Sequence, residues 1–264
     1  MSRIDTRFAQ LKSAGRKALV PFLTAGDPSL ESTVPAMHAL VEAGADVIEL
    51  GVPFSDPMAD GPTIQRSSER ALARGVGIDY VMRSVREFRA RDADTPVVLM
   101  GYLNPVEIRG PLAFAKLAAE SGVDGILLVD LPPEEAAEFR DAFEAAGVAL
   151  ILLASPTSSD TRIAMLQNLA RGYLYYVSFA GVTGAADLLD TGAAGERLRV
   201  IRDGTGVPVV AGFGIKDAAS AAAMAVDADG VVVGSALVSA LADAADPAAA
   251  ARAFLAPLRA ALDA

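Results

Sequence analysis

Cysteine and tryptophan are absent from this 264-residue chain, and histidine occurs only once. Without cysteine the chain has no disulfide, no thiolate metal ligand and no thiol nucleophile. The one histidine, His38, lies in an apolar stretch with helical spacing, where a lone imidazole is typical of a surface or packing residue. A zinc site needs several ligands close together, and the sequence offers no such cluster. We therefore expect no metal and no cofactor in this chain itself.

Basic residues are also scarce. The chain has 23 Lys and Arg against 33 Asp and Glu, a net charge of −10, and an isoelectric point near 4.6. Binding to phosphate backbones relies on clustered basic side chains, so we expect neither a nucleic-acid nor a membrane partner. The first residues lack the apolar core of a signal peptide, and no apolar run reaches the length needed to span a bilayer. These features predict a cytoplasmic protein.

Strand-like and helix-like segments alternate along the chain. Each strand is apolar throughout, as is typical of parallel strands covered on both faces. A helix follows each strand, and a further helix is expected at 2–14. We expect the helix at 29–43 to be capped by Ser29. The predicted strands are 18–24, 46–52, 96–101, 124–130, 148–153, 173–178, 207–211 and 229–233.

Eight such units over this length predict one α/β domain, residues 1–264, folded as a (β/α)₈ TIM barrel. The barrel would carry an extra N-terminal helix and a short phosphate-binding helix after strand eight. A doubly wound sheet also alternates strands and helices. It rarely needs eight evenly spaced units, however, and the G-x-G-x-x-G signature is missing after the first strand.

Residues 46–65 place two carboxylates near one strand end. Glu49 interrupts an otherwise apolar strand, and a buried strand tolerates such a charge only if something pairs with it or uses it. Asp60 follows on a loop stiffened by three prolines. A purely structural role, with Glu49 neutralised by a partner and Asp60 forming a turn, is the alternative. Basic partners are few, because no lysine lies between Lys17 and Lys116. We therefore favour a catalytic role.

The other predicted strand ends are mostly apolar or aromatic, and the last three loops are rich in glycine. An apolar barrel mouth suits a flat apolar substrate portion. Glycine allows close approach of the backbone to a ligand, and loops seven and eight of such barrels often bind phosphate. Turn formation is the simpler explanation for any one of these glycines. The loops carry Gly181–Gly184, Gly212–Gly214 and Gly234–Ser235.

The sequence resembles the α subunit of tryptophan synthase. The segment from Glu49 to Gln65 carries the resemblance most specifically, and the three glycine turns, Pro21–Pro28 and Gly101–Pro105 agree with it. The resemblance runs essentially end to end. It implies retro-aldol cleavage of indole-3-glycerol phosphate to indole and glyceraldehyde 3-phosphate. It also implies a β subunit as partner, which holds pyridoxal phosphate and joins the α subunit in an α₂β₂ assembly.

The resemblance also implies roles for individual residues. Glu49 would exchange protons with indole C3, because burial should raise its pKa. Asp60 would accept the indole N–H as a carboxylate. Phe22, Met100, Leu127 and Tyr175 would line the indole pocket, while Gly184, Gly214, Gly234 and Ser235 would hold the phosphate. Thr183 would belong to a lid, in which Phe179 stands where some members carry Arg. Met100 replaces a frequent Leu.

Other functions fit the residues less well. A sugar isomerase of the histidine-synthesis type would want acidic residues at the ends of strands one and five, which are apolar here. A Schiff-base aldolase needs a desolvated lysine, and Lys216 is predicted on a loop. A catalytically idle partner protein would have no need of Glu49 inside a strand. These comparisons favour the lyase.

Overall fold

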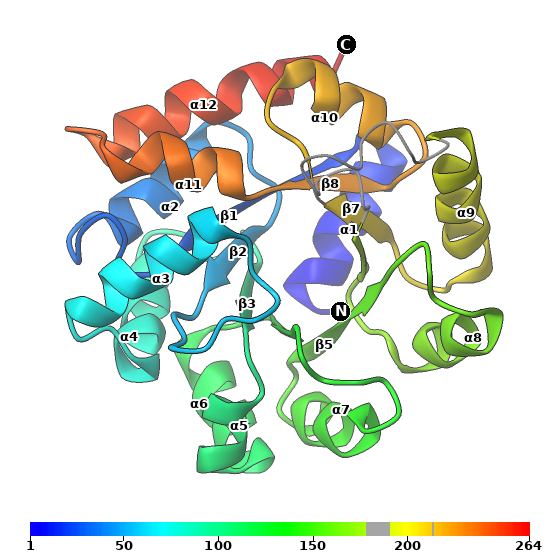
Figure 1. The fold of residues 1–264 in the computed structure, drawn as a ribbon, viewed down its shortest axis with the longest axis horizontal. Coiled ribbons are helices and arrows are strands. Elements are labelled where there is room, and N and C mark those ends of the chain that lie inside the picture. Colours follow the sequence, from blue (N-terminus) through cyan, green and yellow to red (C-terminus); the bar gives the residue numbers. More distant parts are fainter. Residues whose placement is uncertain (178–190, 213) are drawn as a thin grey trace.

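Eight parallel strands close into a barrel in chain order, with β8 returning to pair with β1 (Figure 1). The computed structural model describes residues 1–177, 191–212 and 214–264, and the side chains of residues 191–194 are likewise outside the description. The predicted TIM barrel is confirmed. The strands are β1 (Ala18–Thr24), β2 (Ile48–Gly51), β3 (Val97–Gly101), β4 (Gly125–Leu128), β5 (Ala149–Ala154), β6 (Leu174–Val177), β7 (Val209–Gly212) and β8 (Gly230–Val233).

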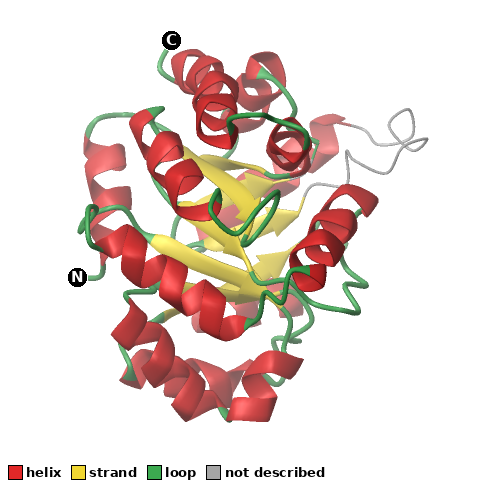
Figure 2. Cartoon of the chain, turned by 90° about the vertical axis from the view of Figure 1, so that its left-hand side faces the viewer, coloured by secondary structure: helices red, strands yellow, loops and turns green. Residues whose placement is uncertain are grey.

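Helices surround this barrel, as the turned view in Figure 2 shows. The extra N-terminal helix and the short helix after β8 are both present, as predicted. The helices are α1 (Arg3–Ser13), α2 (Thr33–Glu42), α3 (Pro62–Ala73), α4 (Ile78–Arg89), α5 (Asn104–Arg109), α6 (Pro111–Ser121), α7 (Ala136–Ala145), α8 (Asp160–Leu169), α9 (Thr191–Gly204), α10 (Ala218–Ala225), α11 (Ser235–Ala242) and α12 (Pro247–Leu262).

Two details of the helix prediction were wrong. Helix α2 begins at Thr33 rather than at residue 29, and its N-cap residue is Ser32. Ser29 instead belongs to a turn, in which its backbone N–H donates to Ser32 Oγ and its carbonyl accepts from the same hydroxyl. The short helix α5, which precedes α6 and is separated from it by Gly110, was not predicted.

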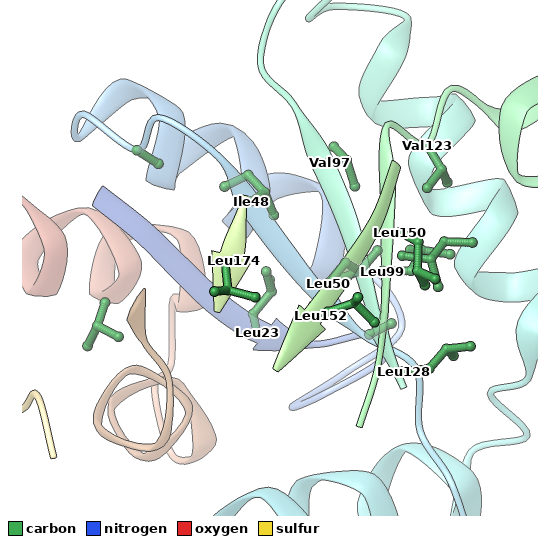
Figure 3. Close-up of a cluster of buried hydrophobic side chains, with 14 of the residues drawn as sticks. Leu23, Ile48, Leu50, Val97, Leu99, Val123, Leu128, Leu150, Leu152 and Leu174 are labelled. Atoms are coloured by element: carbon green, nitrogen blue, oxygen red, sulfur yellow. The ribbon is translucent and has the colours of Figure 1, made fainter. Parts of the chain in front are cut away.

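The strands separate two apolar cores because successive side chains point to opposite faces. Leu23, Ile48 and Leu50 point outward and pack against the helices (Figure 3). Val20, Phe22, Leu127 and Ile151 belong to the second core, which fills the barrel interior. Burying an apolar side chain of this size stabilises the fold by about 1.5–3 kcal/mol. The alternation therefore fixes which residues of each strand face the site.

Helix α1 lies within the ring of strands in Figure 1 and closes the base of the barrel. Its buried residues Ile4, Phe8 and Leu11 belong to the interior core. The Phe8 ring lies 5.8 Å from that of Tyr173, centroid to centroid. A capping box at Ser2 and Asp5 starts the helix. The interior is thus filled from below, which leaves the opposite end of the strands for a ligand.

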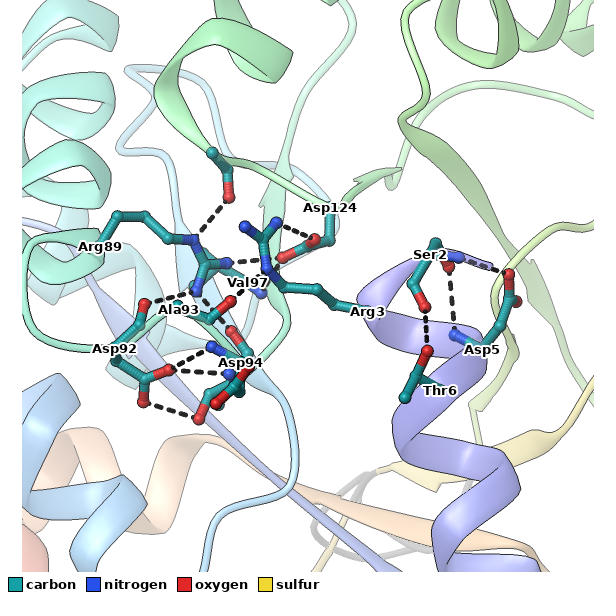
Figure 4. Close-up of polar contacts among 12 residues, drawn as sticks. Ser2, Arg3, Asp5, Thr6, Arg89, Asp92, Ala93, Asp94, Val97 and Asp124 are labelled. Atoms are coloured by element: carbon teal, nitrogen blue, oxygen red, sulfur yellow. Dashed lines mark hydrogen bonds and ion pairs between the residues drawn. The ribbon is translucent and has the colours of Figure 1, made fainter.

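Aspartates tie the strands together at the base. Asp46, Asp124 and Asp229 precede β2, β4 and β8, and each accepts a backbone N–H near the start of the preceding strand at 2.8–2.9 Å. Asp124 also pairs with Arg3 at 2.9 Å and with Arg89 at 2.6 Å (Figure 4). Asp46 and Asp124 are buried, and each carboxylate has more than one donor, which is the arrangement that makes a buried charge tolerable.

None of the helices in the described ranges combines the length and apolarity needed to cross a bilayer.

Candidate active site

Glu49 lies inside the barrel among apolar side chains. Its neighbours in β2, Ile48 and Leu50, belong to the outer core, so alternation turns Glu49 toward the interior. The strand register places it beside Phe22 of β1 and Val98 of β3. The residue is completely buried. The sequence prediction of a carboxylate enclosed at this strand is thereby confirmed for position, although its catalytic role stays a prediction.

One phenol supplies the hydrogen bond to Glu49. Tyr173 Oη, across the barrel, donates to Glu49 Oε1 at 2.5 Å. Oε2 is buried and has no hydrogen-bond partner within the part of the chain that the structure describes. Burial raises the pKa of Glu49 to about 7, and the Tyr173 hydrogen bond opposes this shift. A group with this pKa can both donate and accept a proton near neutral pH.

Asp60 lies on the loop between β2 and α3 and points toward the end of β3. Tyr102 Oη donates to Asp60 Oδ2 at 3.0 Å. Burial raises the pKa of Asp60, and the Tyr102 hydrogen bond opposes that rise. Asp60 lines a small pocket together with Phe22, Gly51, Met100, Tyr102 and Val129. Asp60 therefore faces the same space as two of the residues predicted to hold the ring.

The predicted ring-binding residues come together at the interior face. Phe22, Leu127 and Tyr175 are buried members of the interior core. Met100 is partly buried and packs against this core. Met100 and Leu127 are directly paired in the strand register. A methyl group added at Gly212 would come within 2.0 Å of Tyr175 Oη. The absence of a side chain there makes room for the Tyr175 phenol.

The predicted phosphate-binding turns follow neighbouring strands. The register pairs Val177 with Gly212 and Gly212 with Val232, so the ends of β6, β7 and β8 lie side by side. Gly214 is exposed and has a φ of +74°, a conformation that favours glycine. Gly234 directly precedes α11, so the first amides of that helix, beginning at Ser235, are available at this end.

Thr183 and Gly184, with Phe179 of the expected lid, lie outside the described residues. A methyl group added at Gly234 would contact the Phe22 side chain at 3.7–3.9 Å. This contact places the turn between β8 and α11 next to the ring-binding residues.

Within the described ranges, no three His, Cys, Asp or Glu side chains gather closely enough to hold a metal ion.

The sequence analysis gave no role to the two phenols that bind the carboxylates. Tyr173 precedes β6 and was absent from the predicted site, although its i, i+2 spacing from Tyr175 places both on the interior face. Tyr102 lies in the segment Gly101–Pro105, which supported the family resemblance, but it was given no function. Spacing could have placed both side chains on the correct face. It could not have paired Tyr173 with a carboxylate 124 positions away.

Comparison with known proteins identifies the family of the chain. The family model described as tryptophan synthase alpha chain matches residues 8–261. The tryptophan synthase alpha chain of Xanthomonas euvesicatoria pv. vesicatoria strain 85-10 is 72% identical over 266 residues, covering 100% of this chain and 99% of the relative. The corresponding protein of Xanthomonas oryzae pv. oryzae strain MAFF 311018 is 73% identical over 266 residues, with the same coverage.

Solved structures give the same result. The crystal structure of tryptophan synthase subunit alpha from Legionella pneumophila str. Paris superposes with a TM-score of 0.92 at 46% identity, covering 100% of this chain and 99% of that one. A tryptophan synthase structure from M. tuberculosis, an open form with BRD0059 bound, gives a TM-score of 0.89 at 37% identity, with 99% of each chain covered. The chain therefore belongs to the tryptophan synthase alpha chain family, whose members catalyse the alpha reaction of tryptophan synthase.

Proposed function

We propose that this chain is a lyase that cleaves indole-3-glycerol phosphate by retro-aldol chemistry to indole and glyceraldehyde 3-phosphate. The observation that carries the proposal is a completely buried Glu49 with a pKa of about 7, enclosed by apolar side chains. An acid that changes charge near neutral pH inside an apolar pocket suits proton transfer to a carbon atom. Asp60, in the adjoining pocket, supplies a second carboxylate.

The proposed reaction transfers two protons and breaks one carbon–carbon bond. Glu49 in its protonated form gives a proton to indole C3, and positive charge develops on the ring nitrogen. Asp60 accepts the ring N–H and stabilises that charge. Loss of the proton from the glycerol hydroxyl then forms the aldehyde, as the electrons of the breaking bond return to the ring. The Glu49 carboxylate receives that proton, so the reaction consumes none overall.

Different parts of the mouth would hold the two ends of the substrate. Phe22, Met100, Leu127 and Tyr175 would enclose the indole ring, since their apolar surfaces meet at the interior face. Backbone amides at Gly214, Gly234 and Ser235 would bind the phosphate. The N-terminus of α11 favours an anion through its unpaired N–H groups and its dipole. Thr183 and Gly184 are proposed for the same site from the family resemblance.

The family name also supports a partner. We propose that the chain binds a tryptophan synthase β subunit, as α₂β₂, and passes indole to it. The β subunit, in the cytoplasm, would hold the pyridoxal phosphate. The contact would involve the loop Pro53–Pro57, Asn104 and Pro132. Large apolar side chains lie exposed near these elements, as expected of an interface: Met58 directly after Pro57, Ile108 in α5 and Leu112 in α6 are 81%, 81% and 71% exposed.

Indole release from indole-3-glycerol phosphate by the purified chain, alone and with a β subunit, tests the proposal. The wild type should release indole, whereas Glu49→Gln should release it far more slowly, because glutamine cannot transfer the proton. Equal circular dichroism spectra would show that both proteins are folded. Equal activity of the two proteins, or no activity in either, would contradict the lyase assignment to this site.

A further inference from the structure

The geometry around Asp60 points to Tyr102 as a positioning residue for its carboxylate, an inference that rests on the proposed function. We propose that the Tyr102 hydroxyl holds Asp60 Oδ2 and keeps the carboxylate ionised. Oδ1 is thereby assigned to the ring N–H. A carboxylate on a long loop needs such support, because a rate gain from a preorganised charge depends on fixed orientation.

Two hydrogen bonds fix Tyr102 relative to the loop. Its Oη donates to Asp60 Oδ2 at 3.0 Å and accepts the backbone N–H of Ala59 at 3.0 Å. Accepting the Ala59 N–H leaves the phenol proton to point at the carboxylate. The phenol therefore binds two successive residues of the loop at one point, which restricts both the position and the rotation of the Asp60 side chain.

The phenol is itself held rigidly. Tyr102 is 4% exposed, and its ring stacks on Phe54 of the same loop, with centroids 4.9 Å apart and planes 24° apart. Such aromatic pairs add about 0.5–1.5 kcal/mol beyond burial. From the first turn of α3, which follows this loop, Gln65 Nε2 donates to the Asp60 carbonyl at 2.8 Å. Gln65 thus holds the backbone of Asp60, and only Tyr102 among the described residues holds its carboxylate.

The electrostatic surroundings agree with this role. Burial is the larger influence on Asp60 and raises its pKa, while the Tyr102 hydrogen bond lowers it. Burial, followed by the charges of Asp60 and Asp130, raises the pKa of Tyr102, so the phenol stays a donor. Asp130 follows β4 and accepts the Leu103 N–H at 2.7 Å. Across the barrel, burial raises the pKa of Tyr175, and the charges of Glu49 and Asp60 raise it further.

Tyr102→Phe tests the inference, since it removes the hydroxyl and keeps the ring on Phe54. We expect kcat to fall at least about tenfold with a smaller change in KM, because a hydrogen bond to a charged group is lost at the developing charge. The pKa of Asp60 should rise without its donor. Activity that needs the ionised carboxylate should then begin to fail at a higher pH, which the acid limb of the kcat/KM profile measures.

A matched control is Tyr80→Phe. The Tyr80 hydroxyl also makes two hydrogen bonds, one to the Leu30 carbonyl at 2.6 Å and one with Thr33 Oγ1 at 2.9 Å, and none of these residues lines the pocket that Asp60 lines. Its loss should leave kcat and the pH profile unchanged. If Tyr102→Phe behaves like Tyr80→Phe, the inference is wrong, even where Glu49→Gln and Asp60→Ala have only a small residual activity and the proposed function stands. If those two variants keep full activity, the proposed function itself fails.

Two further measurements separate positioning from general support of the fold. In an Asp60→Ala background, Tyr102→Phe should cause no further loss of activity, because its target is gone; an undiminished loss would overturn the inference. Replacing Tyr102 by 3-fluorotyrosine keeps the ring and makes the phenol a stronger donor. The acid limb should then move to lower pH, opposite to Tyr102→Phe. A shift in the same direction for both, or none for 3-fluorotyrosine, would contradict the proposal.

Discussion

The two ends of the barrel hold buried carboxylates in opposite ways. At the base, Asp46 accepts the Leu19 N–H at 2.9 Å and pairs with Arg259 at 3.0 Å. At the mouth, Glu49 receives one phenol hydrogen bond, and none of the ion pairs between described residues includes Glu49 or Asp60. Burial raises the pKa of Asp46 too, but a backbone N–H and several arginines oppose that rise, where Glu49 has only Tyr173.

This difference separates structural from chemical carboxylates. A carboxylate paired with arginine and backbone N–H groups is held in one protonation state and links strands. A carboxylate left with a phenol as its donor can change protonation state near neutral pH. Conversely, removing a partner at the base should cost stability, and removing the carboxylate at the mouth should cost activity.

Glu49→Gln should reduce kcat by roughly 10²–10⁴-fold, the usual contribution of general acid–base catalysis. Glutamine fills nearly the same space and can still accept the Tyr173 hydrogen bond, so the fold should persist. Indole release at saturating substrate, with thermal unfolding as the check on the fold, measures this. Retention of more than about a tenth of the wild-type kcat would mean that Glu49 is not the main proton-transfer group.

Arg89→Met should destabilise the protein by about 3–5 kcal/mol, because it leaves the buried Asp124 with one fewer cation. Arg89 is 11% exposed and also donates to the carbonyls of Gly122 and Thr95. Urea unfolding measures the loss, and kcat per folded molecule should stay unchanged.

The matched control at the surface is Arg109→Met, which removes a pair with Asp79, itself 81% exposed. Exposed pairs contribute about 0–1 kcal/mol, so this variant should unfold almost like wild type. If both arginine variants lose the same stability, the buried ion pair of Arg89 and Asp124 at the base does not stabilise the fold more than an exposed pair does.

Stability should also depend on pH through Glu49. Its folded pKa of about 7 lies above its usual value of 4.5, so the folded state binds more protons between these values and the free energy of unfolding falls as pH rises through this window. The full shift corresponds to about 3 kcal/mol. Glu49→Gln removes this dependence. The free energy of unfolding of the variant minus that of the wild type should therefore be larger at pH 8 than at pH 4. The same difference at both pH values, measured by urea unfolding, would argue against a raised pKa.

Tyr173→Phe should shift the Glu49 titration by about one pH unit toward higher pH, because the carboxylate loses its hydrogen-bond donor. The phenyl ring would keep its contact with Phe8. Tyr176→Phe, in β6 and three residues further on, is the control, since Tyr176 Oη is buried without a hydrogen-bond partner among the described residues. Its removal should leave the pH profile of kcat unchanged. Equal profiles for the two variants would mean that Tyr173 does not tune Glu49.

Local patterns predicted most of the fold. Apolar runs identified all eight strands, and the interruption of one by Glu49 identified the central carboxylate. The family resemblance, not a local pattern, assigned Phe22 and Tyr175 to the indole pocket, and the structure places both in the interior core. Helix α5 was missed because six residues between a strand and another helix carry little periodic signal. Ser29 was misplaced as a cap because serine forms turns as readily as it caps helices.

The partners of the carboxylates required the closed barrel. Tyr173 reaches Glu49 across the interior, and Tyr102 reaches Asp60 over 42 positions. Neither pair can be predicted from residue spacing within one strand or helix, because barrel closure and strand register decide which side chains meet. The roles of Thr183 and Gly184 stay predictions from the family resemblance.

The most direct test of the central claim is a ¹³C NMR titration of the protein labelled at glutamate side-chain carboxyls, comparing wild type with Glu49→Gln. We predict one glutamate resonance that titrates near pH 7 in the wild type and is missing from the variant, with the other resonances unchanged. If every glutamate of the wild type titrates below about pH 5, as unperturbed glutamates do, Glu49 is an ordinary ionised carboxylate and this account of the site is wrong.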